Sequence, residues 1–206
     1  MSTEFVMKNT RYIIRLIVLI MIAFFSFSLG LKVNVSANST IPSDVRVEEH
    51  IFKNDTLELA YLLYLPKDYN KGDNYRLVLF MHGAGDRGFD FNVLHNIDYG
   101  FVSTYLDDPI YYENTILLVP QCPTPYLWVE DSWASGEYTM TKDPSPASSA
   151  VKELLDYVIY EYPIDISKMY AVGVSMGGMA VWDMIGRYPN LFAAAAPICG
   201  SLDVSK

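Results

Sequence analysis

The stretch YAVGVSMGGMAVWDMIGRYP, residues 170–189, changes its hydrophobic pattern at one serine, Ser175. A short apolar run over residues 169–174 predicts a buried strand, and residues 176–188 have the spacing of a helix that ends before a proline. Ser175 lies in Gly-Val-Ser-Met-Gly, residues 173–177, which matches the pattern G-x-S-x-G. In that pattern a strand turns sharply into a helix and exposes the serine, and the flanking glycines avoid collisions between a Cβ and the neighbouring backbone. The alternative is a small residue in a glycine-rich bend, so the surrounding elements decide.

Strands and helices alternate through the rest of the chain. An amphipathic pattern that follows Ser145-Pro146 predicts a helix that ends at Tyr162-Pro163. Apolar runs predict further strands over residues 57–65, 76–81, 116–119 and 192–198. Because strands that alternate with helices are joined by parallel crossovers, we predict a three-layer α/β sandwich with a mostly parallel sheet.

A second glycine-containing turn follows an earlier strand. Met-His-Gly-Ala-Gly, residues 81–85, stands at the end of the strand predicted over residues 76–81. In enzymes with an exposed serine at a strand-to-helix turn, the second backbone donor for an oxyanion lies at this place. The two turns are therefore both expected in an enzyme of this kind.

Together these blocks resemble the α/β-hydrolase superfamily. They are most similar to the secreted bacterial esterase group that includes feruloyl esterases and polyhydroxybutyrate depolymerases, whose members are often labelled predicted peptidases. The resemblance is carried by LVLFMHGAGDRG (77–88), LLVPQCP (117–123) and VGVSMGGMAVWDMIGRYPNLFAAAAPICG (172–200). It implies a nucleophile at Ser175 and an oxyanion hole formed by the backbone N–H of Met176 and that of Ala84 or Gly85.

The histidine that this fold requires is not found after the serine. In the fold, the triad runs from serine to an acid and then to histidine along the chain, but the three histidines, His50, His82 and His95, all precede Ser175. A serine without a general base is a poor nucleophile at neutral pH. We therefore expect the front portion of a longer enzyme, which lacks the last strands, the triad acid and the histidine.

Two other residues are weaker candidates for the missing triad members. Asp203 follows the last predicted strand, where some members of the superfamily place their acid, but no histidine is available for it to orient. His82 is a candidate base, yet its place in His-Gly-Ala-Gly favours a structural role in the oxyanion loop. For the neighbouring Asp86-Arg87, the alternatives are pairing with each other and shaping the loop.

A long segment without a clear period, residues 122–146, contains several aromatic side chains. A loop of this length inside a compact domain is usually functional. Trp128 and Trp133 are candidates for an aromatic wall of the substrate pocket, and the equal alternative is that the loop packs onto its own domain.

Two cysteines, Cys122 and Cys199, each end a predicted strand. If the order of strands follows the superfamily, two strands lie between them, which places the cysteines about 14 Å apart. A disulfide needs Cα atoms within about 7 Å, so we predict two free thiols.

The N-terminal segment has the features of a secretory signal. Basic residues precede an apolar run over residues 16–31, and Val35-Ser36-Ala37 supplies the small residues that signal peptidase prefers. We expect a signal peptide over residues 1–37, cleavage after Ala37 and a secreted protein, in which residues 38–206 are the N-terminal portion of a single α/β-hydrolase domain. A retained membrane anchor is the alternative, because the run is near the lower length limit for a membrane span.

Charge also narrows the choice of partners. The whole sequence has a net charge of −9, and removal of four basic and one acidic residue with the signal leaves −12. Such a surface repels nucleic acids and anionic lipids and favours a neutral or weakly charged substrate. The resemblance to esterases implies a small or polymer-linked ester. No ligand spacing for a metal and no nucleotide-binding glycine pattern is present, so no cofactor is implied.

The expected function is hydrolysis of carboxylic esters through an acyl-enzyme on Ser175. One alternative is a serine peptidase on the same fold, because the same turn serves amides and esters. Another is a non-catalytic secreted binding protein that kept the fold and lost its base. The missing histidine favours the binding protein, whereas the intact serine turn and oxyanion loop oppose it.

Overall fold

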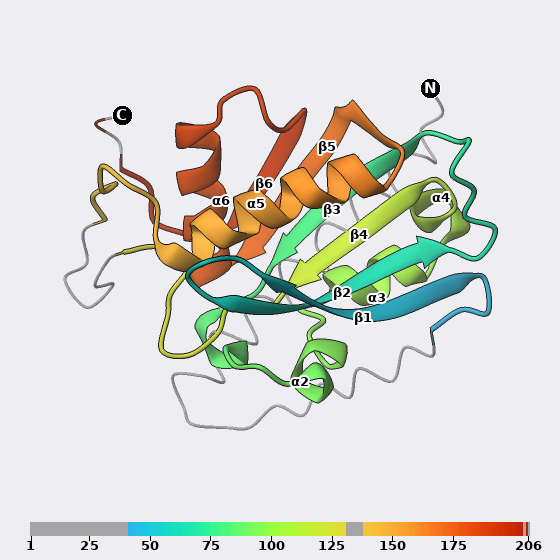
Figure 1. Cartoon of the computed structure of the whole chain (residues 1–206), viewed down its shortest axis with the longest axis horizontal. Coiled ribbons are helices and arrows are strands. Elements are labelled where there is room, and N and C mark those ends of the chain that lie inside the picture. Colours follow the sequence, from blue (N-terminus) through green and yellow to red (C-terminus); the bar gives the residue numbers. More distant parts are fainter. Residues whose placement is uncertain (1–40, 131–137, 204, 206) are drawn as a thin grey trace, which may run out of the picture.

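Six strands form one sheet in the order β1-β2-β4-β3-β5-β6 in a computed structural model that describes residues 41–130, 138–203 and 205 (Figure 1). The strands β3, β4, β5 and β6 run parallel to their neighbours among themselves, whereas β1 and β2 join the sheet antiparallel. The strands are β1 (Val45–Lys53), β2 (Glu58–Pro66), β3 (Tyr75–Met81), β4 (Thr115–Pro120), β5 (Ile164–Val174) and β6 (Ala194–Ile198). The mostly parallel sheet predicted from the sequence is thus confirmed.

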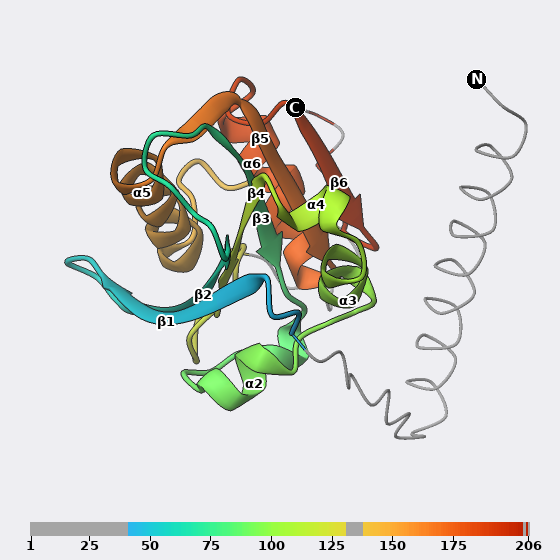
Figure 2. The ribbon, with the colours of Figure 1, turned by 90° about the vertical axis from the view of Figure 1, so that its right-hand side faces the viewer.

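Helices cover the two faces of this sheet, so that the molecule has three layers. Figure 2 shows α5 and α3 on opposite sides of the strands. The helical segments are η1 (Ala84–Asp86), α2 (Phe91–His95), α3 (Phe101–Leu106), α4 (Pro109–Tyr112), α5 (Pro146–Glu161) and α6 (Met176–Arg187). The α/β sandwich architecture is therefore the one that the alternating pattern predicted.

Alternate side chains of each central strand belong to different cores. Leu77, Leu79 and Met81 of β3 pack in the cluster that includes α5 and α6, whereas Val78 and Phe80 point into the cluster that includes α2, α3 and α4. Successive side chains of a strand point to opposite faces, so a strand covered on both sides must be apolar throughout. The nearly unbroken apolar runs of β3 and β4 have this cause.

The helix α5 begins and ends as the sequence predicts. The Ser145 hydroxyl accepts a hydrogen bond of 3.0 Å from the Ser148 N–H, Pro146 occupies the first helical position, and the helix ends at Glu161. Side chains on one stripe of the helix are fully buried against the sheet, among them Val151, Leu154 and Leu155. This stripe fixes α5 across the face of the sheet.

Three parts of the fold were not predicted. The edge strand β1 contains Glu48 and Glu49 and is half exposed, so its apolar signal is weak. The strand β5 begins at Ile164 rather than near Met169, because its first half is exposed and polar. The short helices α2, α3 and α4 have four to six residues each, which is too short for a helical period to appear.

The strand order also decides the state of the cysteines. Cys122 follows β4 and Cys199 follows β6, and the strands β3 and β5 lie between these two. Both cysteines are free, as predicted, with Cys122 buried and Cys199 exposed. Burial raises the pKa of the Cys122 thiol to about 12, so this group is inert as a nucleophile.

The expected signal peptide, residues 1–37, lies outside the described residues. Within residues 41–130, 138–203 and 205, no helix has the length and apolar character needed to cross a membrane.

Candidate active site

Ser175 lies at an abrupt turn between the end of β5 and the first residue of α6. Its backbone has φ of 56° and ψ of −117°, a combination that costs energy for any residue with a Cβ. The residue is exposed, although Gly173 before it and Met176 after it are buried. The serine turn predicted from the sequence is therefore present, and its hydroxyl is presented to solvent at the N-terminal end of a helix.

Glycines around Ser175 are required by close packing of the backbone. A Cβ on Gly173 would lie less than 3.0 Å from the Gly177 carbonyl group, and a Cβ on Gly177 would lie equally close to the carbonyl oxygens of Met81 and His82. Such distances are not tolerated without movement of the backbone. The pattern G-x-S-x-G thus has the steric cause inferred from the sequence.

The oxyanion loop, which we define as residues 83–88, begins beside this turn. Met81 at the end of β3 is paired in register with Gly173 of β5, so the residues that follow each strand emerge from neighbouring positions at one edge of the sheet. Gly177 packs on the carbonyl groups of Met81 and His82, which joins the start of α6 to the start of the loop. The backbones of Met176 and of Ala84 and Gly85 therefore belong to the same corner of the molecule, and an oxyanion hole formed by them stays a prediction.

His82 is a structural residue of this corner. Its side chain is fully buried, Nδ1 is 2.6 Å from the Gly83 carbonyl oxygen, and Nε2 accepts a hydrogen bond of 2.9 Å from the Cys122 N–H. Burial lowers the pKa of the imidazole below its usual value of 6.5, so the ring is neutral at pH 7. Because both ring nitrogens are engaged, His82 is not available as a base for Ser175.

Side chains of the loop itself and of the segment after β4 hold the rest of the oxyanion loop. The Arg87 guanidinium donates to the carbonyl oxygens of Ala84 at 3.0 Å and Tyr126 at 3.3 Å. The Gln121 amide nitrogen donates to the Asp86 carbonyl oxygen at 2.9 Å. The sequence left two alternatives for Asp86-Arg87, pairing with each other or shaping the loop. Arg87 shapes the loop, because its guanidinium binds backbone oxygens. The role of Gln121 had no signal in the sequence.

Trp128 fits the packing alternative rather than the substrate wall. The residue has no exposed surface, its indole N–H donates to the His82 carbonyl oxygen at 3.1 Å, and its ring centroid lies 5.3 Å from that of His82. A side chain enclosed in this way supports the oxyanion loop from below. Trp133, the other predicted wall residue, lies outside the described residues.

The later part of the long loop is anchored on the helix that begins after Ser175. The Tyr138 hydroxyl donates to the buried Asp183 carboxylate at 2.7 Å, and Arg187 pairs with the same carboxylate at 2.6 Å. Arg187 also donates to the carbonyl oxygens of Thr141 and Lys142. These contacts fix the path of the chain beside α6.

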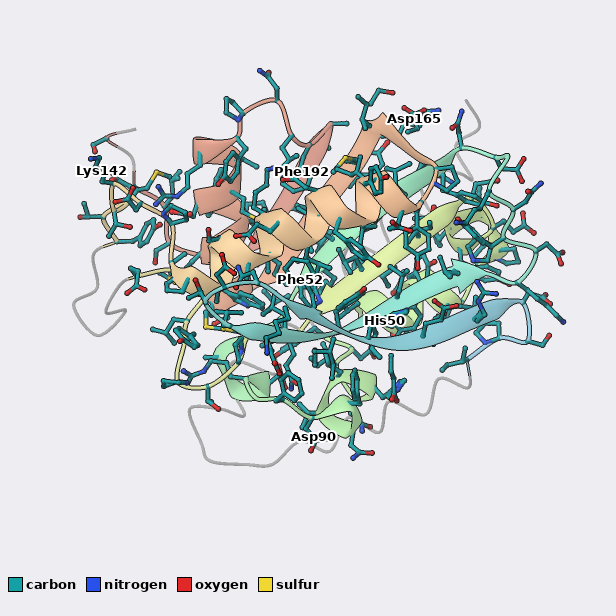
Figure 3. The ribbon with its side chains drawn as sticks, in the orientation of Figure 1. His50, Phe52, Asp90, Lys142, Asp165 and Phe192 are labelled. Atoms are coloured by element: carbon teal, nitrogen blue, oxygen red, sulfur yellow. The ribbon has the colours of Figure 1, made fainter. Side chains whose placement is uncertain are left out.

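The remaining titratable candidates are bound elsewhere. Asp203 accepts from the Met140 N–H at 3.0 Å and from Ser205, so its carboxylate ties two loops together. His50 lies on β1 (Figure 3) and contacts Glu48. His95 of α2 contacts Glu49 of the same strand. Because β2, β4 and β3 separate β1 from β5, neither histidine can reach Ser175.

Within the described ranges, no three His, Cys, Asp or Glu side chains come together in a way that could hold a metal ion.

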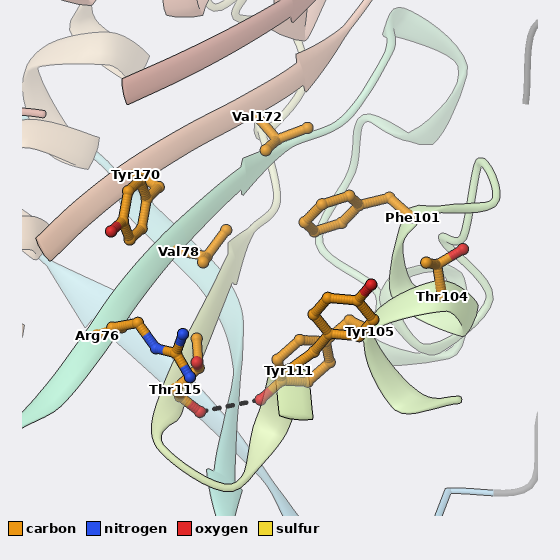
Figure 4. Close-up of a pocket in the computed structure, with 9 residues that line it drawn as sticks. All are labelled: Arg76, Val78, Phe101, Thr104, Tyr105, Tyr111, Thr115, Tyr170 and Val172. Atoms are coloured by element: carbon orange, nitrogen blue, oxygen red, sulfur yellow. Dashed lines mark hydrogen bonds between the residues drawn. The ribbon is translucent and has the colours of Figure 1, made fainter. Parts of the chain in front are cut away.

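A separate apolar cavity of about 370 Å³ lies between the sheet and α3 (Figure 4). Its lining includes Arg76 and Thr115, which stand near the beginnings of β3 and β4, and Phe101 of α3. Ser175 lies beyond the opposite, C-terminal ends of the parallel strands. Ser175 is not among the residues that line this cavity.

Comparison with known proteins agrees with the fold. The sequence model of the prolyl oligopeptidase family matches residues 149–206. Acetylxylan esterase A of Emericella nidulans is 30% identical over 154 residues, which are 72% of this chain and 44% of that protein. Poly(3-hydroxyalkanoate) depolymerase C of Paucimonas lemoignei is 37% identical over 51 residues, which are 25% of this chain and 12% of that protein.

A solved structure described as a thermostable esterase has a TM-score of 0.67 and 35% sequence identity, over 81% of this chain and 44% of that one. The chain has the α/β-hydrolase fold. The relatives that it matches include esterases, and the chain spans less than half of the length of the acetylxylan esterase and of the thermostable esterase, 44% in both cases.

Proposed function

We propose that the protein is a serine hydrolase that cleaves carboxylic esters through an acyl-enzyme on Ser175. The observation that carries this proposal is the exposed serine on a positive-φ turn at the start of α6, beside the oxyanion loop. A binding protein has no need for a backbone conformation that costs energy at this residue. Esterases among the relatives support the same activity.

The chemistry follows from the two loops. The Ser175 Oγ attacks the acyl carbon and loses its proton to a base, while the N–H groups of Met176 and of Ala84 or Gly85 donate to the oxygen that becomes negative. The tetrahedral intermediate then expels the alcohol, which takes up that proton, and leaves the acyl group on Oγ. Water attacks the acyl carbon in the same manner, so that the carboxylic acid departs and the serine hydroxyl is restored.

The base for these steps is a separate proposal. The three histidines of the sequence are either engaged on both ring nitrogens or held far from Ser175. We propose that a histidine and an acid of a longer protein complete the triad, a proposal supported by the 44% share of the esterase relatives that the chain spans. Sequencing the coding frame downstream of Lys206 tests this: a later acid and histidine would support it, and a verified stop codon would contradict it.

The substrate class follows from charge and from the relatives. A net charge of −9, or −12 after removal of a signal peptide, favours neutral or weakly charged esters. The names of the relatives refer to acetylxylan and to a poly(3-hydroxyalkanoate), so we propose a small or polymer-linked ester. Export through the segment over residues 1–37 would bring the enzyme to such polymers outside the cell.

The test is ester hydrolysis by the full-length protein and its Ser175→Ala variant. We expect the wild type to hydrolyse p-nitrophenyl acetate and to react covalently with a fluorophosphonate at Ser175, and we expect the variant to do neither. Ser43→Ala, on an exposed serine before β1, is the matched control and retains both properties. Activity that survives in Ser175→Ala would refute the role of this serine.

A serine peptidase is the second candidate, because the prolyl oligopeptidase family matches residues 149–206. This segment holds the serine turn, which serves amides as well as esters. Peptide p-nitroanilides distinguish the two activities: a peptidase cleaves them with an efficiency similar to that for esters. If the wild type reacts with no ester, no amide and no fluorophosphonate, the alternative of a non-catalytic binding protein is the correct one.

A further inference from the structure

Tyr99 is a strained residue next to the oxyanion loop. It lies in the connection between α2 and α3 and has φ of 49°, a left-handed conformation that aromatic residues rarely adopt. The following Gly100, with φ of 73°, continues this turn into α3. Such strain persists where the surrounding structure determines the position of the residue.

The side chain of Tyr99 connects this turn to the oxyanion loop. Its hydroxyl donates a hydrogen bond to the Asp86 carboxylate and lies close to Gly83 of the same loop. A Cβ on Gly83 would lie 2.9 Å from this oxygen. The ring of Tyr99 lies beside the buried Phe80 of β3, with 6.3 Å between the ring centroids. One phenol thus contacts both ends of the short turn η1.

The Tyr99 side chain contacts the oxyanion loop at a different place from the other side chains that hold it. Arg87 and Gln121 bind carbonyl oxygens, and His82 lies below the loop in the core. Tyr99 instead is 43% exposed, and its hydroxyl binds the side chain of Asp86 close to Gly83. Ala84 and Gly85 lie between Gly83 and Asp86, and their N–H groups are the donors that the proposed mechanism assigns to the oxyanion hole.

We propose that Tyr99 is a positioning residue, which acts through Asp86 and Gly83 to hold the N–H groups of Ala84 and Gly85 where the oxyanion forms. This inference rests on the proposed ester hydrolysis and assigns a function to the strained turn before α3. Displacement of an oxyanion donor by about 1 Å can reduce the rate about 100-fold. The effect is expected in the transition state, so kcat should change and KM should not.

The Tyr99 hydroxyl stays protonated in neutral solution. Burial, together with the hydrogen bond and negative charge of Asp86, raises the pKa of the phenol above its usual value of 10.0. The group therefore remains a hydrogen-bond donor to Asp86 at the pH at which esters are assayed.

The experiment compares Tyr99→Phe with the wild type in the full-length protein. We expect kcat for p-nitrophenyl acetate to fall about 10- to 100-fold, with KM within about twofold. Affinity for a trifluoromethyl ketone, whose adduct with serine carries an oxyanion, should fall by the same factor as kcat. Tyr160→Phe on the exposed surface of α5 is the matched control and should change neither value.

A double-mutant cycle with Asp86 tests whether the two residues act together. Asp86→Ala should reproduce the loss of Tyr99→Phe, and the double variant should lose no more than either single variant. Asp86→Asn should retain most of the activity, because an amide oxygen still accepts the phenol hydrogen bond. Thermal unfolding of each variant verifies that the fold is intact. The inhibitor affinity and KM do not depend on how much of the protein is folded, so their ratio is a second control.

Each outcome decides between the possibilities. An unchanged kcat, additive losses in the double variant, or a rise in KM alone would refute the positioning role, and a rise in KM alone would make Tyr99 a substrate contact. If the positioning role is refuted in one of these ways, the Tyr99→Phe variant should still react with the fluorophosphonate at the wild-type rate. The proposed ester hydrolysis on Ser175 then stands. A wild type that reacts with neither ester nor fluorophosphonate refutes both proposals.

Discussion

Two glycine-containing loops meet at the candidate active site, and they are held in place by different forces. The turn around Ser175 is fixed by backbone packing, because Gly173 and Gly177 leave no room for a Cβ. The oxyanion loop is fixed by side chains, since Arg87, Gln121 and His82 bind its backbone or the strand ends around it. One loop therefore depends on positions that lack a Cβ, and the other depends on hydrogen bonds from side chains.

The largest expected effect is that of a methyl group in the serine turn. Gly177→Ala should lower the free energy of unfolding by roughly 4 kcal/mol or more, because its Cβ would overlap the carbonyl groups of Met81 and His82. Chemical denaturation measures this loss. Gly72→Ala is the matched control, since its Cβ would meet only the Asn70 side chain at ordinary contact distances. Equal stability of the two variants would contradict steric control of the turn.

The second effect concerns the hydrogen bonds below the oxyanion loop. His82→Ala should cost about 3 kcal/mol of stability, because it leaves the buried Cys122 N–H without its acceptor and opens a cavity. Denaturation at pH 7.5 measures this cost. A loss below about 1 kcal/mol would show that the loop does not need the imidazole.

The pH dependence of stability separates the contribution of His82 further. Since the pKa of His82 in the folded protein is lower than the usual value of 6.5, the unfolded chain binds more protons below that pH. Stability should therefore be greatest above about pH 6.5 and should fall as the pH drops below this value. His82→Ala should show a smaller fall between pH 7.5 and pH 5. An identical fall in both proteins would contradict the neutral, buried imidazole.

A smaller effect of opposite sign is expected at the nucleophile. Ser175→Gly should raise the free energy of unfolding by about 1 kcal/mol, because glycine adopts φ of 56° without the steric cost that serine has. Ser175→Ala, which keeps the Cβ, should not show this gain. Thermal unfolding of the two variants gives the comparison, and a gain in Ser175→Ala of the same size would attribute it to the hydroxyl instead.

The smallest effect is expected in the oxyanion loop itself. A Cβ on Gly85 would meet nothing within 4 Å, so Gly85→Ala should change stability by less than about 0.5 kcal/mol. Denaturation alongside Gly177→Ala tests the contrast between the loops directly. Destabilisation comparable to that of Gly177→Ala would show that both loops are controlled by steric packing.

The same contrast explains what the sequence could predict. Steric requirements leave a local pattern, so Ser175, its glycines, the preceding strand and the following helix were all recognised. Support by distant side chains leaves no local pattern, so Gln121 and Tyr99 were missed although they contact Asp86. For Asp86-Arg87 the sequence left two alternatives open, because only the folded chain brings the Tyr126 carbonyl to Arg87.

Aromatic residues in the long loop show a similar limit. The composition of residues 122–146 predicts a functional loop, but it does not separate an exposed tryptophan from a buried one. The structure places Trp128 beneath His82 with its indole N–H satisfied. Likewise, β1 was missed because an edge strand with adjacent glutamates has little apolar pattern, although its pairing with β2 extends along its whole length.

The close contact between Gly177 and the end of β3 has a consequence for the order of folding. Met81 and Gly177 are far apart in the chain, and contacts of this kind form slowly because a long loop must close before they can be made. The conformation that exposes Ser175 can therefore be reached only after β3 and β5 have paired and α6 has docked on them. We expect the reactivity of the serine to appear late in refolding, so that a polypeptide still in the course of synthesis carries no active nucleophile.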